Sequence, residues 1–556
     1  MTCFQSTERV AGARWARISM CALAGYWLLL ALRYASMYWL ENPAGRIWAI
    51  QDDMYISASF ARTLADGNGL RWYAGAPKVE GFSNPAWVAL MAAFHALPGF
   101  SPSFLGALLF AVNAVALTLL AATIVAGLMR LHTDAPRSGT WRWVVLLALA
   151  PGCASLCVAA GHGFELPVLA LLVTLAFVEG LRPAHALRPG RIGLLVGLAF
   201  WTRMDGLVSA APAIALALCK IRGRAGLARL LGVAGSMIAA LLLARRAYYG
   251  EWYPNTYFLK ISGWPLDNRL HHGWFQNVVT LTALASLLLP LAVFGWFRLE
   301  RRHRPALLAL AAAPLCVVYS TTNGGDFIWP AFGYDRFAST GTALLILGLG
   351  VLLLKARVSW WQAPLLCAWT LAIIAVPSLI SLRVDPGPRF TYGMNSHAAR
   401  ALFDPRSESN PPRELLAAEL IYRGELLEEF TEPGARIAVC DAGAQVYFSR
   451  RGGVDILGKI EPYIAHLPAM LEPPPERRCW RGFAPSGHNK EDVPGLFRLR
   501  RPELSQVVPP VEQAESYVTI SYKGRQFHAR RDTALVRWRS VVVSVAPRDR
   551  MTSRAH

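Results

Sequence analysis

The sequence lacks the signature motifs of several large enzyme classes. It contains no GxxxxGKS/T phosphate loop, no HExxH, no GxSxG and no Cys/His spacing typical of a zinc site. A phosphate loop needs its glycines and lysine to cradle nucleotide phosphates, and a zinc protease needs two histidines on one helical face. These absences argue against a transport ATPase, a zinc protease and a serine lipase.

Acidic residues are scarce compared with basic ones. The chain has 36 Asp and Glu against 56 Lys and Arg, which gives a net charge of +20. In a soluble protein this excess would suggest a nucleic-acid partner. Here the arginines cluster in short loops between apolar runs, as on the cytoplasmic side of membrane proteins. We therefore expect a lipid bilayer as partner and no nucleic acid.

Long stretches contain no charge at all, and 54% of the residues are hydrophobic. Residues 103–129 are one such stretch. A run of about 18 or more apolar residues predicts a transmembrane helix. The sequence predicts about eleven spans, at 19–40, 103–129, 143–160, 165–180, 191–202, 206–219, 230–247, 276–297, 305–320, 338–354 and 360–382.

The segment 86–98 decides the orientation of the predicted spans. It has about 13 apolar residues, too few for a full span and typical of an interfacial or re-entrant segment. If it does not cross and the N-terminus is cytoplasmic, all the basic loops fall inside; they are 130–142, 181–192, 220–229, 298–304 and 355–357. The N-terminal segment lacks a small-x-small cleavage site, so we expect a retained anchor and an extracytoplasmic C-terminus.

The tail differs in composition from the rest of the chain. Residues 413–430 have helix-like charge, and 436–440, 517–522 and 540–545 resemble short strands. We expect two domains, a transmembrane domain at 1–382 with an outside loop at 41–85, and an extracytoplasmic α/β domain at 383–556. If the tail is outside, Cys440 and Cys479 could form a disulfide.

The first outside loop carries two adjacent carboxylates, Asp52 and Asp53. Adjacent acids just beyond a hydrocarbon core are costly unless they have a task or a cation. One could take a proton from an acceptor hydroxyl while the other orients it, or the two could bind a divalent metal. A helix N-cap pair at the membrane surface explains them equally well.

Three further positions have both a structural and a functional explanation. Asn84, followed by Pro85, is more typical of a helix start than of a catalytic group. Arg203 lies in a turn that interrupts an apolar stretch, where broken helices are tolerated if they line a cavity; it could also simply pair with Asp205. Glu165 could be an acid that a helix dipole favours.

Two outside loops carry cations suited to a phosphate. The loop 248–260 combines six aromatic residues with Lys260, and 323–337 contains Asp326, Asp335 and Arg336. Arginine binds phosphate bidentately. A lipid-phosphate leaving group needs such a cationic clamp, and the acceptor needs a carboxylate base.

The first loop, DDMYISASFARTLADGNGLRWYAGAPKVEGFSNPAW, resembles that of the GT-C membrane glycosyltransferases. It is most similar to the terminal arabinofuranosyltransferases of the mycobacterial cell wall and their Gram-negative relatives. The resemblance extends over nearly the whole chain, through GFELP, TRMDG, YYGEWYPNTYFLK, GGDF with GYDRF, DAGAQVYFS, VDILGKIEPYIA and GHNK. The first loop and PNTYFLK are its most specific parts.

The resemblance implies a GT-C fold with an outer-face active site and a polyprenyl-phosphate sugar as donor. It implies that Asp52 and Asp53 are the catalytic base and its partner. Donor phosphate would be bound by Lys260 and Arg336, with Arg203 as a further candidate. The substrate-binding candidates are Glu80, Asn84, Tyr257, Asp326, His488 and Lys490, the last two in a tail domain that covers the active site.

The sequence departs from the family pattern at three places. Tyr73 stands where Asn is usual, Phe82-Ser83-Asn84 where Tyr-Thr-Asn is usual, and the tail motif GHxKYDYD is only partly kept. These departures bear on the sugar and the acceptor more than on the reaction class.

Two functions from different classes follow from these patterns. The first is a bacterial inner-membrane enzyme that moves an arabinofuranose-like pentose or a hexose to an extracytoplasmic glycan, lipopolysaccharide or protein. The second is a non-catalytic transporter or flippase of lipid-linked sugars, which should show paired broken helices in two related halves. Nucleotide-sugar use is not expected on the outer face. A divalent cation at Asp52 and Asp53 remains open.

Overall fold

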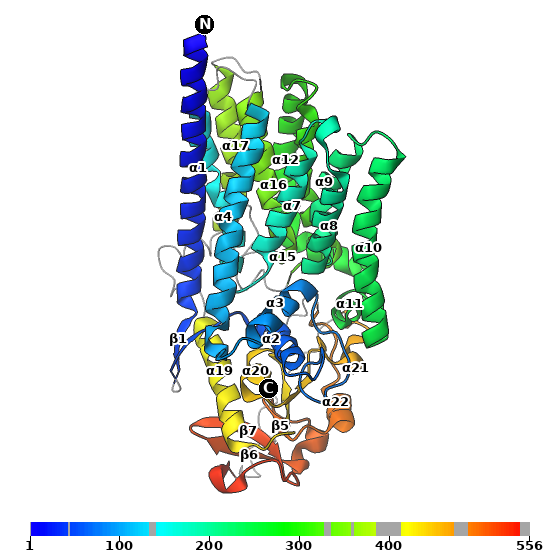
Figure 1. The fold of residues 1–556 in the computed structure, drawn as a ribbon. Coiled ribbons are helices and arrows are strands. Elements are labelled where there is room, and N and C mark those ends of the chain that lie inside the picture. Colours follow the sequence, from blue (N-terminus) through cyan, green and yellow to red (C-terminus); the bar gives the residue numbers. More distant parts are fainter. Residues whose placement is uncertain are drawn as a thin grey trace.

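The structure is a computed structural model. It describes residues 2–42, 45–132, 141–326, 335–356, 361–384, 413–471 and 487–544. Helices precede a C-terminal part that contains a sheet (Figure 1). The helices of the first part are α1 (Thr2–Met37), α2 (Asp52–Ala65), α3 (Pro85–His95), α4 (Leu105–His132), α5 (Trp141–Ala148), α6 (Ala154–Gly161), α7 (Leu166–Gly180), α8 (Pro189–Thr202), α9 (Gly206–Leu218), α10 (Arg224–Tyr249), α11 (Asn255–Lys260), α12 (Leu266–Arg298), α13 (Ala312–Thr322), α15 (Arg336–Ser339), α16 (Thr342–Lys355) and α17 (Gln362–Val384).

Within the described residues, 6 helical stretches are long and apolar enough to cross a membrane. They are Arg14–Met37, Pro102–Leu131, Arg224–Tyr249, Thr280–Arg298, Arg304–Thr322 and Arg336–Lys355. Several shorter apolar helices pack among them, α7 and α9 included. The predicted polytopic helical architecture is confirmed, whereas the number of about eleven spans stays a prediction.

Helix α16 forms the centre of the bundle. Its sequence is apolar on all sides, and every side chain from Thr342 to Leu354 is buried. A helix that is hydrophobic all round belongs in a core. Its glycines allow close packing, since a Cβ at Gly348 or Gly350 would lie 2.7 Å or 2.9 Å from a leucine side chain. Small residues at helix contacts are typical of membrane bundles.

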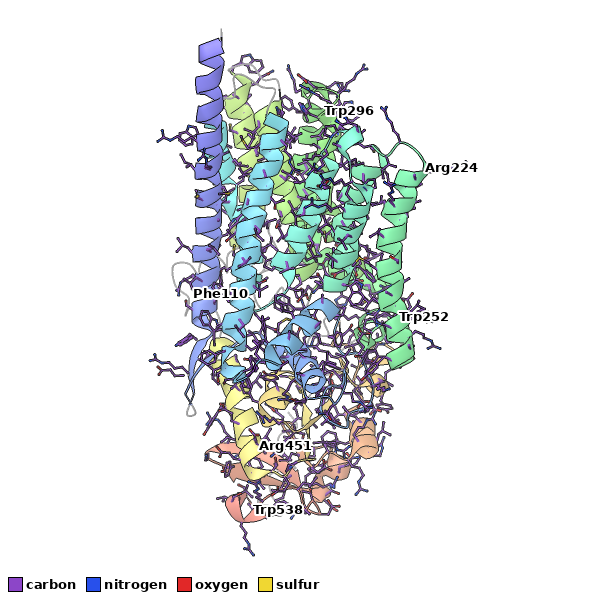
Figure 2. All side chains as sticks on the ribbon, in the orientation of Figure 1. Phe110, Arg224, Trp252, Trp296, Arg451 and Trp538 are labelled. Atoms are coloured by element: carbon purple, nitrogen blue, oxygen red, sulfur yellow. The ribbon has the colours of Figure 1, made fainter. Side chains whose placement is uncertain are left out.

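The two ends of the bundle differ in charge. The chain begins at one end, where Arg224 and Trp296 also lie, and the C-terminal part covers the other end, near Trp252 (Figure 2). Loops 220–229 and 298–304 thus share the end opposite the C-terminal part, the arrangement that the basic-loop argument requires. The orientation in a membrane stays a prediction.

The C-terminal part consists of short helices around a 6-stranded sheet of order β4-β3-β5-β7-β6-β8. Strand β3 pairs in parallel with β4 and β5, and the remaining pairs are antiparallel. The predicted helix at 413–430 and strands near 436–440, 517–522 and 540–545 are found. The elements are α19 (Arg413–Phe430), β3 (Arg436–Val439), α20 (Ala444–Ser449), β4 (Gly452–Asp455), α21 (Pro462–Ala465), α22 (Val493–Arg500), β5 (Leu504–Ser505), β6 (Tyr517–Tyr522), β7 (Arg525–Arg530) and β8 (Val542–Ser544).

Helices α2 and α3 lie between the bundle and the C-terminal part (Figure 1). They follow a hairpin of β1 (Trp39–Asn42) and β2 (Gly45–Trp48). Helix α3, which covers most of the short segment 86–98, packs against α2 at the end of the bundle. Its predicted interfacial or re-entrant place in a membrane stays a prediction. The rings of Tyr55 on α2 and Tyr447 on α20 are 5.2 Å apart, so the first loop contacts the tail directly.

The proposed boundary between the two domains, after residue 382, falls at the end of α17 and next to residues outside the described part. Cys440 is disulfide-bonded. Its predicted partner, Cys479, lies outside the described residues, so the pairing stays a prediction.

Candidate active site

A cavity of about 190 Å³ lies where the bundle, the first loop and the tail meet. Its wall includes side chains from segments far apart in the sequence. The charged ones are Asp53, Glu165, Arg203, Asp205, Lys260, Arg336 and Lys459. Uncharged polar residues, among them Ser57 and Asn84, complete the wall together with apolar and aromatic groups. A pocket with convergent polar groups is typical of a ligand site.

Asp52 and Asp53 are in the first turn of α2, but they face different surroundings. The helix cap is Gln51, whose Oε1 accepts the backbone N–H of Asp53 at 2.7 Å. The interpretation of the acid pair as the N-cap is therefore wrong. Successive helical residues point in directions about 100° apart, so only one of the two lines the cavity, and this is Asp53.

Asp53 contacts two cations. Its Oδ2 accepts a hydrogen bond from Nη1 of Arg336 at 3.0 Å, and its Oδ1 pairs with Lys459. Burial alone would raise the pKa of Asp53, but Lys459 and Arg336 outweigh it and hold the pKa well below its usual range. Asp53 is therefore an ionised carboxylate at the cavity wall.

Asp326 fixes the guanidinium of Arg336. Its carboxylate accepts hydrogen bonds from Nη2 at 2.8 Å, from Nε at 2.9 Å and from the backbone N–H of Arg336 at 2.9 Å. Such bidentate pairs combine strength with geometric specificity. Asp326 therefore positions Arg336 and is not itself part of the cavity wall.

Lys260 is the cation of the cavity without an ion pair among the described residues. It ends α11, and its Nζ lies 6.0 Å from the centre of the Phe337 ring. Burial, with a contribution from Arg336, lowers the pKa of Lys260 to about 8. A lysine held in this way is ready to bind an anion, because no carboxylate in the described part of the chain is ion-paired with it.

Arg203 pairs with Asp205 and also lines the cavity. The structural explanation of this residue, an ion pair, is therefore compatible with a place at the cavity wall. The Arg203 guanidinium donates to both Asp205 oxygens at 2.9 Å and to Glu165 at 2.9 Å. Glu165 also accepts from Asn84 at 3.0 Å, and Asn84 accepts from Ser57 at 3.0 Å. Asn84 precedes α3 without a side-chain capping bond, so its amide belongs to this network.

The other predicted residues lie away from the cavity wall, with the exception of Tyr257, which lines it. Glu80 forms a buried ion pair with Arg245. The Lys490 ammonium donates to three backbone carbonyls, at 2.6 Å, 2.7 Å and 2.9 Å. These are all the donors that an ammonium has. His488 is buried in the same part of the tail. Their contact with substrate stays a prediction.

Lys459 was not among the residues predicted from the sequence. It lies within VDILGKIEPYIA, but nothing in that segment distinguishes one cation as a partner of Asp53. The Asn255 amide holds the segment, since Nδ2 donates to the carbonyls of Gly458 at 2.9 Å and Lys459 at 3.1 Å. The PNTYFLK and VDILGKIEPYIA segments thus meet in space, a relation that only the fold reveals.

The aspartate pair does not fit a shared divalent cation. Both Asp53 oxygens contact cationic side chains, and both Asp52 oxygens accept backbone N–H groups. Among the residues that the structure describes, no three His, Cys, Asp or Glu side chains gather as metal ligands. The arrangement favours action through charge and hydrogen bonds.

No family model and no curated protein sequence matches the chain. Among solved structures, the chain is similar to the crystal structure of ArnT from Cupriavidus metallidurans bound to undecaprenyl phosphate. The TM-score is 0.47 and the identity 13%, over 93% of this chain and 99% of that chain. A likeness at this level leaves the family of the chain open.

Proposed function

We propose that the chain is a membrane glycosyltransferase of the GT-C type. It transfers a sugar from a polyprenyl-phosphate donor to a hydroxyl of an extracytoplasmic glycan, lipopolysaccharide or protein. One observation supports this above all: Asp53, Lys260 and Arg336 come from three separate family-like segments and line one cavity. A carboxylate facing two fixed cations in a confined space is what transfer from a lipid phosphate requires.

The cations would serve the leaving group. Cleavage of the bond between the anomeric carbon and the phosphate oxygen leaves an additional negative charge on the lipid phosphate. Lys260 would bind that phosphate as a point charge, and Arg336 would donate two parallel hydrogen bonds. Preorganised donors of this kind stabilise the developing charge without having to reorient. Arg203, held by Glu165 and Asp205, would offer the phosphate a further guanidinium donor at the cavity wall.

Asp53 would serve the acceptor or the anomeric carbon. It could accept the proton of the acceptor hydroxyl, or stabilise positive charge on the sugar. Its ion pairs make it a weak base before the donor binds. A donor phosphate that engages Arg336 would compete with Asp53 for the guanidinium, and the basicity of Asp53 would rise. We assign Asp52 to positioning, because its oxygens are bound to the tail.

We also propose that the sugar is an arabinofuranose-like pentose or a hexose. The protein would lie in the bacterial inner membrane with the cavity on the outer side. The proposed domains are residues 1–382 and residues 383–556.

The test is transfer from labelled polyprenyl-phosphate sugars by the full-length protein in nanodiscs, with envelope material of a deletion strain as acceptor. Asp53→Asn keeps the size of the side chain and should lower the rate by about 100-fold or more. Asp66→Asn, at the exposed C-cap of the same helix, should leave it unchanged. Full activity of Asp53→Asn would refute the catalytic assignment. Movement of labelled lipid between leaflets without transfer would favour a flippase.

A further inference from the structure

A second cavity, of about 410 Å³, lies beside the first. Residues 81–84 of the first loop line the first cavity, whereas residues 72–77 and Val79 line the second. In the tail, Lys459 lines the first cavity, and Asp455 and Ile460 line the second. Two segments of the chain therefore form the partition between the cavities. A chain-like molecule bound in the second cavity would be close to Asp53.

Aromatic rings form one wall of this second cavity. A Cβ at Gly453 would lie 2.1 Å from the Trp72 ring, and one at Gly452 would lie 3.1 Å from the Tyr73 ring. The two glycines of β4 thus leave room for both rings against the strand. Aromatic side chains with a polar edge are well suited to ligands that have both apolar faces and hydroxyl groups.

The indole of Trp72 has an unused donor. Trp72 is 3% exposed, and its Nε1–H has no hydrogen-bond partner within the described part of the chain. A buried indole N–H normally finds an acceptor, and leaving a buried donor unmade costs about 1–3 kcal/mol. The ring of Trp72 therefore forms part of the cavity wall, while its Nε1 is enclosed by the protein.

The second cavity has more positive than negative charge. Its acids are Asp455 and Glu461, and its cations are Arg436, Arg450, Arg451 and Arg500. Glu461 is already paired with Arg500, at 2.7 Å and 2.8 Å. The two oxygens of Asp455 accept backbone N–H groups, so this acid offers little to a cation in the cavity.

Two of these arginines, Arg450 and Arg451, carry positive charge that no acid of the cavity neutralises. Arg451, in the C-terminal part (Figure 2), donates to Thr431 and to the backbone carbonyl of Glu428, which are neutral oxygens. The Arg450 side chain is 62% exposed, and its ion pair with the Glu428 carboxylate is long, at 3.9 Å. Arg450 is thus able to bind an anionic group at the cavity mouth.

We propose that the second cavity binds an acidic saccharide, with a sugar ring against the partly buried Tyr73 and a carboxylate or phosphate group at Arg450. The role of this saccharide as the acceptor rests on the proposed function. Its binding in the second cavity is independent of that function. The bound chain would then present a hydroxyl to Asp53 across the partition.

Direct binding to the full-length protein in nanodiscs, measured without donor, tests this. The probes are tetragalacturonate, which carries carboxylates, the phosphorylated core oligosaccharide of lipopolysaccharide, and neutral maltotetraose. We expect an acidic probe to bind, its affinity to fall with added salt, and maltotetraose to bind weakly. Binding of only one acidic probe would identify the anionic group as carboxylate or phosphate.

Two variants locate the binding site. Arg450→Gln should weaken binding of the acidic probe by about tenfold, the effect of losing one charge-assisted contact. Arg498→Gln is the matched control, because Arg498 has the same 62% side-chain exposure but pairs with Glu512 outside this cavity. Tyr73→Leu removes the partly buried aromatic ring from the cavity wall and should also weaken binding.

The outcomes separate this inference from the proposed function. It is overturned if neither acidic probe binds, if maltotetraose binds equally well, or if Arg450→Gln and Arg498→Gln behave alike. Asp53→Asn should bind the acidic probe normally. If that variant also transferred sugar at the full rate, the proposed function would fail while the acidic-saccharide site stood.

Discussion

The Oδ1 of Asp52 accepts a hydrogen bond of 2.7 Å from the backbone N–H of Ala444, 392 residues further along the chain. Its Oδ2 accepts the N–H of Gly443 at 3.1 Å. A Cβ at Gly443 would lie only 1.9 Å from the backbone oxygen of Asp52, so this contact requires glycine. The tail is thereby joined to the helix turn that carries Asp53.

Replacing Asp52 should weaken this junction. Asp52→Ala leaves two backbone N–H groups without their acceptor, and each such group costs about 1–3 kcal/mol. We expect a lower unfolding temperature in detergent, and faster proteolytic cleavage between bundle and tail. Asp66→Ala, on the exposed end of α2, is the control and should change neither. Equal stability of the two variants would contradict a positioning role for Asp52.

The stability of the protein should fall as the pH rises from about 4 to 7. Burial, together with the nearby Asp441, raises the pKa of Asp52 to about 7. An unfolded aspartate titrates near pH 3.9, so between about pH 4 and pH 7 the folded state binds the extra proton. Stability therefore declines as that proton is lost with increasing pH. Asp455, with a pKa raised by burial to about 6, acts in the same direction.

Asp52→Asn provides the check on this pH dependence. The amide does not titrate, so the decline in unfolding temperature between about pH 4 and pH 7 should be smaller than in the original chain. It should not vanish, because Asp455 still titrates. A slope unchanged by Asp52→Asn would mean that Asp52 is ionised in the folded protein throughout this range.

The ion pair of Glu80 and Arg245 should affect the stability of the first loop more than the sugar-transfer reaction. The Glu80 side chain is 4% exposed and that of Arg245 is 1% exposed. Removing one partner leaves a buried charge, at a cost of about 3–5 kcal/mol. The backbone oxygen of Glu80 also accepts the N–H of Asn255 at 2.9 Å, so movement here reaches α11.

A double-mutant cycle tests this pair. Glu80→Gln and Arg245→Met should each lower the unfolding temperature strongly, while the double variant should lose less than the sum. Additive losses would show that the two side chains stabilise the fold independently.

Several features could be predicted from the sequence because they depend on local patterns. Uncharged runs predicted the apolar helices, and 413–430 is indeed a helix. The site residues predicted from the sequence also included Asp53, Lys260 and Arg336. It could not separate Asp53 from Asp52, because which of two adjacent helical residues faces a cavity depends on how the helix is rotated. Lys459 was missed because its contact with Asp53 arises only when the tail packs on α2.

Lys260 and Lys490 form a natural pair for separating donor binding from structure. Lys260 lines the first cavity without an ion pair among the described residues, whereas Lys490 is 1% exposed and binds three carbonyls. Lys260→Gln should raise the KM for the lipid-phosphate donor at least tenfold and leave the unfolding temperature nearly unchanged. Lys490→Gln should destabilise the fold by about 3 kcal/mol, since its hydrogen bonds come from a charged donor.

Comparing sugar transfer by the two lysine variants decides whether Lys260 binds the donor phosphate. Transfer by Lys490→Gln should recover at lower temperature, where the variant stays folded, whereas transfer by Lys260→Gln should not. Lys260→Arg keeps the charge and should restore part of the donor affinity, although an arginine fork does not reproduce the position of an ammonium. A normal KM in Lys260→Gln would remove this lysine from the phosphate site and leave Arg336 as the principal cation for the donor.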